Sequence, residues 1–300
     1  MGIFSGLEAL GLDKIVGDDL FETEAREAEE KKKADERAAR NELKVHTPKI
    51  LTEGDYIFLK TYKCPCCRTD FKNPTVKSNK ARLIKQDTDL RPIYRDIDPL
   101  KYDVVMCPNC GYAALTSYFD KITMPQVKLV RAGISSHFTP REFETILDYS
   151  DTYLRYQLAL GNAMVKRSRA SEKAFICLKT AWILRGYRER LLSPDNTEGP
   201  VNEATITALE KDEAEFINKA YEGFVEARAN ETPPICGMDT VTMDYLVAAL
   251  AYKTGNLDNA ARLVSSILLK NTVGKHTKDS ARELKDMIIS DIKKQKGQES

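Results

Sequence analysis

The chain has 300 residues, of which 42% are hydrophobic and 30% are charged, as expected for a folded protein with at least one sizeable core. Its 46 Lys and Arg nearly balance its 45 Asp and Glu, so the chain as a whole lacks the basic footprint of a nucleic-acid-binding protein. No apolar run approaches the roughly 18 residues that span a bilayer, and the amino terminus lacks the charge pattern of a signal peptide. We therefore expect a cytoplasmic protein without membrane contact.

The first predicted segment, residues 1–50, contains a stretch at 21–44 made almost entirely of charged residues and alanine. Glu29 precedes Lys33 by four residues, and two further acid–base pairs have the same spacing, which supports an isolated helix. The stretch has no large apolar stripe to bury, so we expect an exposed helix.

The second segment, residues 51–122, has short runs typical of strands between frequent prolines, which favours a small β domain. The expected strands lie at Asp55–Tyr62, Val76–Ile84 and Tyr102–Met106.

Two CPxC motifs lie in this segment, one formed by Cys64 and Cys67 and the other by Cys107 and Cys110. Two residues between cysteines make a tight turn that directs both sulfurs at one ion. Four thiolates complete a closed tetrahedral shell, which suits one structural Zn²⁺. The alternatives are free cytosolic thiols, a redox pair or a rubredoxin-like iron site.

Three other cysteines do not belong to these two pairs. Cys66 lies inside the first motif, where it could replace an outer cysteine as a ligand, but CxxC geometry favours Cys64 and Cys67. Cys177 lies in an apolar helical run typical of a core. Cys236 lies in a loop. The chain's three histidines have no ligand spacing to the cysteines.

Residues 68–106 separate the two motifs and must loop out between them. Residues 72–85 are basic without an acid, so they could contact phosphate groups or form a solvated strand face. The stretch that follows, residues 87–104, mixes Asp, Arg and Tyr. These side chains could form a binding surface, but we favour ion pairs and hydrogen bonds that fix a long loop.

The motifs and the segments between them resemble the bacterial family called domain of unknown function 2225. The likeness covers roughly residues 50–290 and implies a zinc-ribbon-like head on a helical body with weak tetratricopeptide character. The family has no assigned activity, so the resemblance implies no reaction. The residues that carry the likeness are Tyr62–Pro65, Ala81–Arg82, Asp89–Pro92, Asp98–Asp103 and Cys107–Ala114.

The third segment, residues 123–296, is helical in its apolar spacing. Thr139, Pro140 and Glu142 form a capping-box pattern that predicts a helix start. The expected helices lie at about 141–166, 170–190, 203–229, 240–253, 257–269 and 278–294.

Residues 245–264 have the helix–turn–helix spacing of a tetratricopeptide repeat, with Gly255 in the turn. Such repeats often present a concave groove to a protein partner, here around Tyr245 and Tyr252. A plain helical bundle, with both tyrosines in the core, uses the same packing rules.

The predicted fold class is thus α+β, mostly α, with a small zinc-ribbon-like β domain followed by an antiparallel, tetratricopeptide-like helical domain. The chain lacks a P-loop, GxGxxG, GxSxG and HExxH. The leading hypothesis is therefore a non-enzymatic adaptor that binds unidentified protein partners through its helices. The alternatives are a nucleic-acid-binding zinc-ribbon protein and an enzyme that uses the Asp/Arg/Tyr stretch or Cys66.

Overall fold

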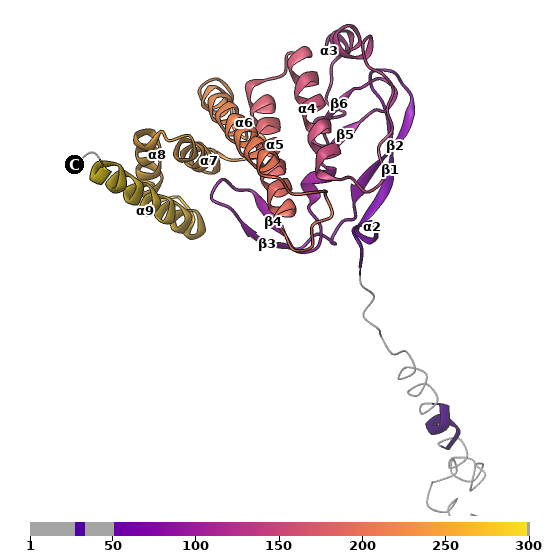
Figure 1. Ribbon diagram of the computed structural model, residues 1–300, viewed down its shortest axis with the longest axis horizontal. Coiled ribbons are helices and arrows are strands. Elements are labelled where there is room, and N and C mark those ends of the chain that lie inside the picture. The colour runs from indigo at the N-terminus through magenta and orange to yellow at the C-terminus, as the bar shows by residue number, and fades with distance from the viewer. Residues whose placement is uncertain (1–27, 34–50, 299–300) are drawn as a thin grey trace, which may run out of the picture. The chain divides into compact units, whose positions relative to one another are not determined.

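The computed structural model describes residues 28–33 and 51–298 (Figure 1). The chain divides into two compact units, Met1–Leu51 and Thr52–Ser300. In the first unit, residues 28–33 are helical and exposed, and Glu29 pairs with Lys33 at 2.9 Å, as the i,i+4 pattern predicts. The rest of the predicted helix at 21–44 lies outside the described residues.

The strands of the second unit form three separate antiparallel pairs, β1 with β2, β3 with β4, and β5 with β6. In the first and third pairs, a CPxC motif forms the loop that joins the two strands. A short helix, α2 (Glu53–Tyr56), leads into the first pair. The strands are β1 (Ile57–Lys63), β2 (Asp70–Val76), β3 (Leu83–Gln86), β4 (Pro92–Tyr94), β5 (Val104–Met106) and β6 (Ala113–Leu115).

The predicted strand at Val76–Ile84 is wrong, because β2 ends at Val76 and β3 begins at Leu83. A turn separates the two strands, with the Lys80 amide donating to the Lys77 carbonyl at 3.3 Å. Asn79 takes a positive φ of 65° in this turn, a conformation that Asn tolerates better than most residues. The strand-like run between prolines therefore predicted extended chain where the backbone reverses.

Seven α-helices of 7 to 28 residues follow the strands within the described part of the chain, and most agree with the predicted ranges. A short 3-10 helix, η3 (Pro99–Tyr102), precedes β5, and a π-helical turn, η4 (Arg131–Ser135), follows α3. Asp148, Asn202, Asp239 and Asn256 cap helix starts with side-chain oxygens. The helices are α3 (Met124–Val130), α4 (Tyr149–Val165), α5 (Ala170–Leu191), α6 (Glu203–Asn230), α7 (Thr240–Lys253), α8 (Leu257–Leu269) and α9 (Lys275–Gln298).

The predicted helix start near residue 141 is wrong, because α4 begins only at Tyr149. The Asp148 carboxylate accepts from the Asp151 amide at 2.6 Å and supplies the cap. Upstream, the Arg141 amide donates to the Pro108 carbonyl at 3.1 Å, so this segment bonds to the second CPxC loop instead of to itself. A tertiary contact thus overrides the local capping pattern.

The main core joins β5 and β6 to the helices. Both β5 and β6 are fully buried, and Val104 and Leu115 belong to the same apolar cluster as Tyr156 and Ala159 of α4. Burial of each large apolar side chain contributes roughly 1.5–3 kcal/mol, so the two parts stabilise each other. An α+β fold that is mostly α is confirmed, whereas the domain boundary between 122 and 123 stays a prediction.

No helix within residues 28–33 and 51–298 has the length and apolar character needed to cross a membrane.

Candidate metal centre

The first CPxC loop is a tight turn held by its own backbone. The Cys64 amide donates to the Thr69 carbonyl at 3.0 Å, and the Arg68 amide donates to the Cys64 carbonyl at 2.9 Å. Arg68 takes a φ of 69°, which is in the left-handed region. This conformation turns the chain back into β2 and leaves both sulfurs on one side of the loop.

The second CPxC loop repeats this backbone pattern at the other hairpin. The Cys107 amide donates to the Tyr112 carbonyl at 2.9 Å, and the Gly111 amide donates to the Cys107 carbonyl at 3.1 Å. Gly111 has a φ of 72°, and a Cβ here would lie 2.5 Å from the Phe138 ring. Glycine therefore fits this position for both its backbone freedom and its lack of a side chain.

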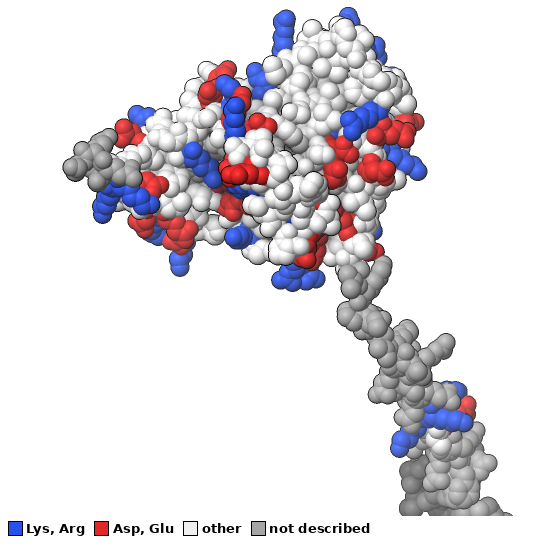
Figure 2. Space-filling model, in the orientation of Figure 1, with Lys and Arg blue, Asp and Glu red and all other residues white. Residues whose placement is uncertain are grey.

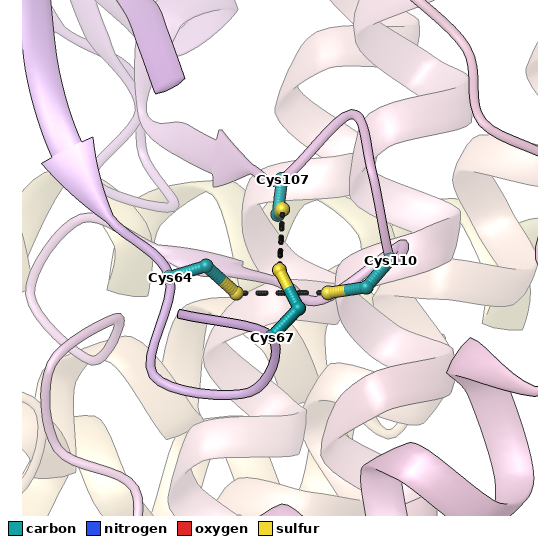
Figure 3. Close-up of side chains that lie close together, drawn as sticks. All are labelled: Cys64, Cys67, Cys107 and Cys110. Carbon is teal, nitrogen blue, oxygen red and sulfur yellow. Dashed lines mark hydrogen bonds between the residues drawn. The ribbon is translucent and has the colours of Figure 1, made fainter. Parts of the chain in front are cut away.

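The two loops bring four sulfurs together (Figure 3). Cys64 Sγ lies 3.6 Å from Cys110 Sγ, and Cys67 Sγ lies 3.6 Å from Cys107 Sγ. All four atoms lie within 4.8 Å of one another. A tetrahedral ion with Zn–S bonds of about 2.3 Å needs sulfurs about 3.8 Å apart, so the donor set fits a four-coordinate metal ion.

Hydrogen bonds within this cluster shift the pKa values of its thiols. Hydrogen bonds from Cys107 and Cys64 lower the pKa of Cys110 to about 2, whereas a hydrogen bond with Cys110 raises the pKa of Cys107 to about 12. Neighbouring thiols therefore shift one another's pKa values in opposite directions. A bound cation would replace the thiol protons and hold all four groups as thiolates.

Cys66 lies outside the group of four, although its side chain is fully buried. Its carbonyl oxygen accepts from Arg131 Nε at 2.7 Å and also from Arg131 Nη2. Arg131 lies in the π-helical turn after α3, so a helix beyond the strands fixes the first loop. Sequence reasoning missed Arg131, because nothing in its local pattern relates it to a cysteine motif.

The second loop also has a partner in the helices. Asn162 of α4 is fully buried, and its Nδ2 donates to the Gly111 carbonyl at 2.9 Å. No sequence signal singled out this residue either.

The other cysteines and histidines of the described residues lie apart from the cluster. Cys177 is buried in the main core, and Cys236 Sγ accepts from the Tyr118 hydroxyl at 3.5 Å. His137 and His276 are exposed, and His46 lies outside the described residues.

The Asp/Arg/Tyr stretch fixes its loop on α5 through ion pairs. The buried Asp89 carboxylate lies 2.6 Å from Arg185 Nη2, and Arg91 Nη2 lies 2.7 Å from Glu189 Oε2. Burial alone would raise the pKa of Asp89, but the hydrogen bonds and positive charge of Arg185 outweigh it and lower the pKa below its usual value. These contacts correspond to the anchoring interpretation of the stretch.

The fold and the cluster define an α+β protein, mostly helical, with four cysteines placed to hold a metal ion. A family model described as "Uncharacterized protein conserved in bacteria (DUF2225)" matches residues 57–288, and the chain belongs to this family. The resemblance inferred from the cysteine motifs is therefore confirmed. No curated protein and no solved structure matches the chain.

Proposed function

We propose that Cys64, Cys67, Cys107 and Cys110 hold one structural Zn²⁺ that joins the two hairpin loops in a zinc-ribbon-like head. The observation that carries this proposal is the group of four sulfurs, three on buried residues, within 4.8 Å of one another. Four thiolates leave no open coordination position, so the site suits folding and not catalysis.

Metal analysis of protein purified without added zinc tests this assignment. We expect one zinc per chain, and bound iron or a ratio near zero would overturn it. Cys107→Ser removes one ligand, so the protein should lose the metal and the head should unfold, because structural zinc contributes on the order of 10 kcal/mol to small domains. Cys66→Ser is the matched control and should keep the metal, since Cys66 lies outside the group.

We further propose that the protein is a cytoplasmic, non-enzymatic adaptor that binds a protein partner on its helical body. The α7–α8 pair, with Gly255 at a φ of 77° in the turn, supports a tetratricopeptide-like arrangement. The expected groove around Tyr245 and Tyr252 needs revision, however. Tyr245 is only 5% exposed and belongs to the core, while the Tyr252 hydroxyl donates to Asp291 Oδ2 at 2.7 Å.

A better candidate surface lies between the β3–β4 hairpin and helices α7 and α9. A cavity of about 710 Å³ lies there. Leu83 and Ile84 at its edge are 54% and 58% exposed. Exposed apolar side chains beside a cavity favour a protein partner.

Affinity capture from the native cell with a Leu83→Ser/Ile84→Ser double variant tests the adaptor role. We expect loss of a captured partner with unchanged stability, because both side chains are already exposed. Leu269→Ser, at a residue that is 81% exposed and outside this cavity, is the control. Capture that survives the double variant would place the partner elsewhere.

Nucleic-acid binding remains the alternative proposal. Lys72, Lys80, Arg82 and Lys85 are exposed, but Lys77 donates to the Asp55 carbonyl at 2.8 Å. On the face in Figure 2, acidic and basic side chains are interspersed over the second unit. Salt-dependent retention on DNA or RNA would favour this alternative over the adaptor role.

A further inference from the structure

Three buried arginines lie in the second unit, and one of them differs from the other two. Arg91 and Arg185 pair with carboxylates, and those partners raise the pKa of each guanidinium although burial alone would lower it. Arg155 of α4 is 2% exposed, yet no carboxylate of the described residues lies within ion-pair distance of it. A buried charge without a counter-charge is costly and marks a candidate site for a ligand.

The guanidinium of Arg155 is fixed through one nitrogen only. Nη2 donates to Asn73 Oδ1 at 2.5 Å and to the Val104 carbonyl at 2.6 Å. Nε has no hydrogen-bond partner, and Nη1 donates to no group within the described ranges. Burial lowers the pKa of Arg155 to about 10, which leaves the group charged at neutral pH.

Arg155 lines a cavity of about 660 Å³, a volume ordinary for a small-molecule site. The cavity lies between the hairpin that carries the first CPxC loop, the second CPxC loop and residues 140–145. Part of the wall is apolar, with Phe71, Met106 and Phe143 among the lining residues. The segment at 140–145 is the one that the capping pattern wrongly predicts as helix.

The charges around the cavity select the kind of anion. Asp70 and Lys72 offset each other, and Arg141 pairs with Asp151 at 3.0 Å. Glu142 is exposed, so the buried Arg155 guanidinium is left with one positive charge and no carboxylate of the described residues at ion-pair distance. A monoanion balances this charge, whereas a dianion such as a phosphate monoester would leave an excess of negative charge. The apolar wall suits a hydrocarbon body attached to the charged group.

We propose that this cavity binds a small organic monocarboxylate, with the carboxylate accepting a hydrogen bond from Arg155 Nη1 and the apolar part packed against Phe71 and Phe143. This proposal does not depend on the adaptor role. The proposed ligand would lie beside the candidate metal centre, since Thr69 and Asn109 of the two CPxC loops also line the cavity.

Calorimetric titration of the full-length, zinc-loaded protein with hexanoate tests the proposal. We expect saturable binding of hexanoate, binding of the neutral isostere hexanamide at least about tenfold weaker, and no displacement by equimolar inorganic phosphate. The proposal would be overturned if hexanoate did not bind, if hexanamide bound equally well, or if phosphate displaced hexanoate. Each of these results would be decisive regardless of how the variants behave.

Arg155→Met removes the charge at similar volume and should weaken hexanoate binding at least about tenfold. Arg141→Met is the control, because Arg141 lines the same cavity but is exposed and already pairs with Asp151 at 3.0 Å. We expect it to change affinity by less than about threefold. Hexanoate affinity in Arg155→Met equal to that of the wild type would show that Arg155 is structural and overturn the assignment.

Discussion

The two CPxC loops have the same backbone hydrogen-bond pattern, but they differ in the residue that turns the chain away from the cysteines. The second loop has glycine at this position, whereas the first has Arg68 at nearly the same positive φ. A non-glycine residue in the left-handed region costs roughly 1–2 kcal/mol. The first loop therefore keeps a strained residue that the metal centre and the surrounding hydrogen bonds hold in place.

Arg68→Gly should stabilise the zinc-loaded protein by about 0.5 kcal/mol, because the relief of strain exceeds the roughly 0.5–1 kcal/mol entropy cost of glycine. Urea unfolding measures the difference. Gly111→Ala is the counterpart and should destabilise by about 1 kcal/mol or more, since its Cβ would lie 2.5 Å from the Phe138 ring. A destabilised Arg68→Gly variant would mean that the arginine side chain stabilises the loop.

As the pH is lowered, the protein should lose its metal over a narrower pH range than the titration of a single group would give. Each thiol must lose its proton to bind a cation, so protons compete with zinc at several sulfurs together. Zinc release into a chromogenic chelator between pH 7 and pH 4 measures this. Release that is independent of pH would contradict thiolate ligation.

The four clustered cysteines were predictable because CPxC is a local pattern whose turn geometry follows from its spacing. Arg131 and Asn162 were not predictable, because each meets its loop only through the packing of a helix. Arg155 gave no signal either, since an arginine on a helix is ordinarily exposed.

At the scale of elements, the loop between the CPxC motifs is fixed by a few buried ion pairs. Asp89 contacts Arg185 at 2.6 Å and Lys253 at 3.6 Å, so it connects this loop to both α5 and α7. Arg185 also contacts Glu213 of α6 at 2.7 Å. One carboxylate thus contributes to the arrangement of three helices.

Asp89→Asn should destabilise the protein by about 3 kcal/mol or more, because it leaves Arg185 buried with fewer counter-charges. The pKa of Asp89 is lowered in the folded state, so its contribution is present above the unfolded pKa of about 3.9 and is lost as pH falls through the folded value. Unfolding of both proteins by urea at pH 7 and pH 3 measures this. The difference between wild type and variant should narrow at pH 3, and a difference independent of pH would contradict the ion pair.

Helix positions were largely predictable because apolar spacing and Gly, Pro and Asn signals fixed their limits. The ranges 240–253 and 257–269 agree with α7 and α8. The exception is the start of α4, where the Arg141 amide bonds to Pro108. Local capping signals do not reveal an acceptor that lies on another element.

At the scale of the whole molecule, β5 and β6 share the main core with the helices. The Tyr156 hydroxyl donates to the Leu100 carbonyl at 2.8 Å, and α4 packs directly on β5 and β6. Sequence patterns separate the two regions at residue 123 because the type of periodicity changes there. They cannot show that the apolar face of one region is covered by the other.

Chelation of the metal should therefore lower the thermal midpoint of the helices as well as the strands. We expect far-ultraviolet circular dichroism at 222 nm, which reports the helices, and near-ultraviolet signals from Tyr62 and Tyr112 beside the cluster to change in one transition. Two separate transitions, with helix melting unaffected by chelator, would show that the helical region folds independently.

The order in which the ligands occur along the chain has a consequence for synthesis on the ribosome. The first two thiols emerge well before Cys107 and Cys110, so the ion cannot be fully enclosed until the second hairpin has left the exit tunnel. Even then, Val104 and Leu115 stay uncovered until α4 and α5 follow. A nascent chain that stalls after the second hairpin has left the tunnel, but before α4 and α5 have left it, would present the apolar face of β5 and β6 to chaperones.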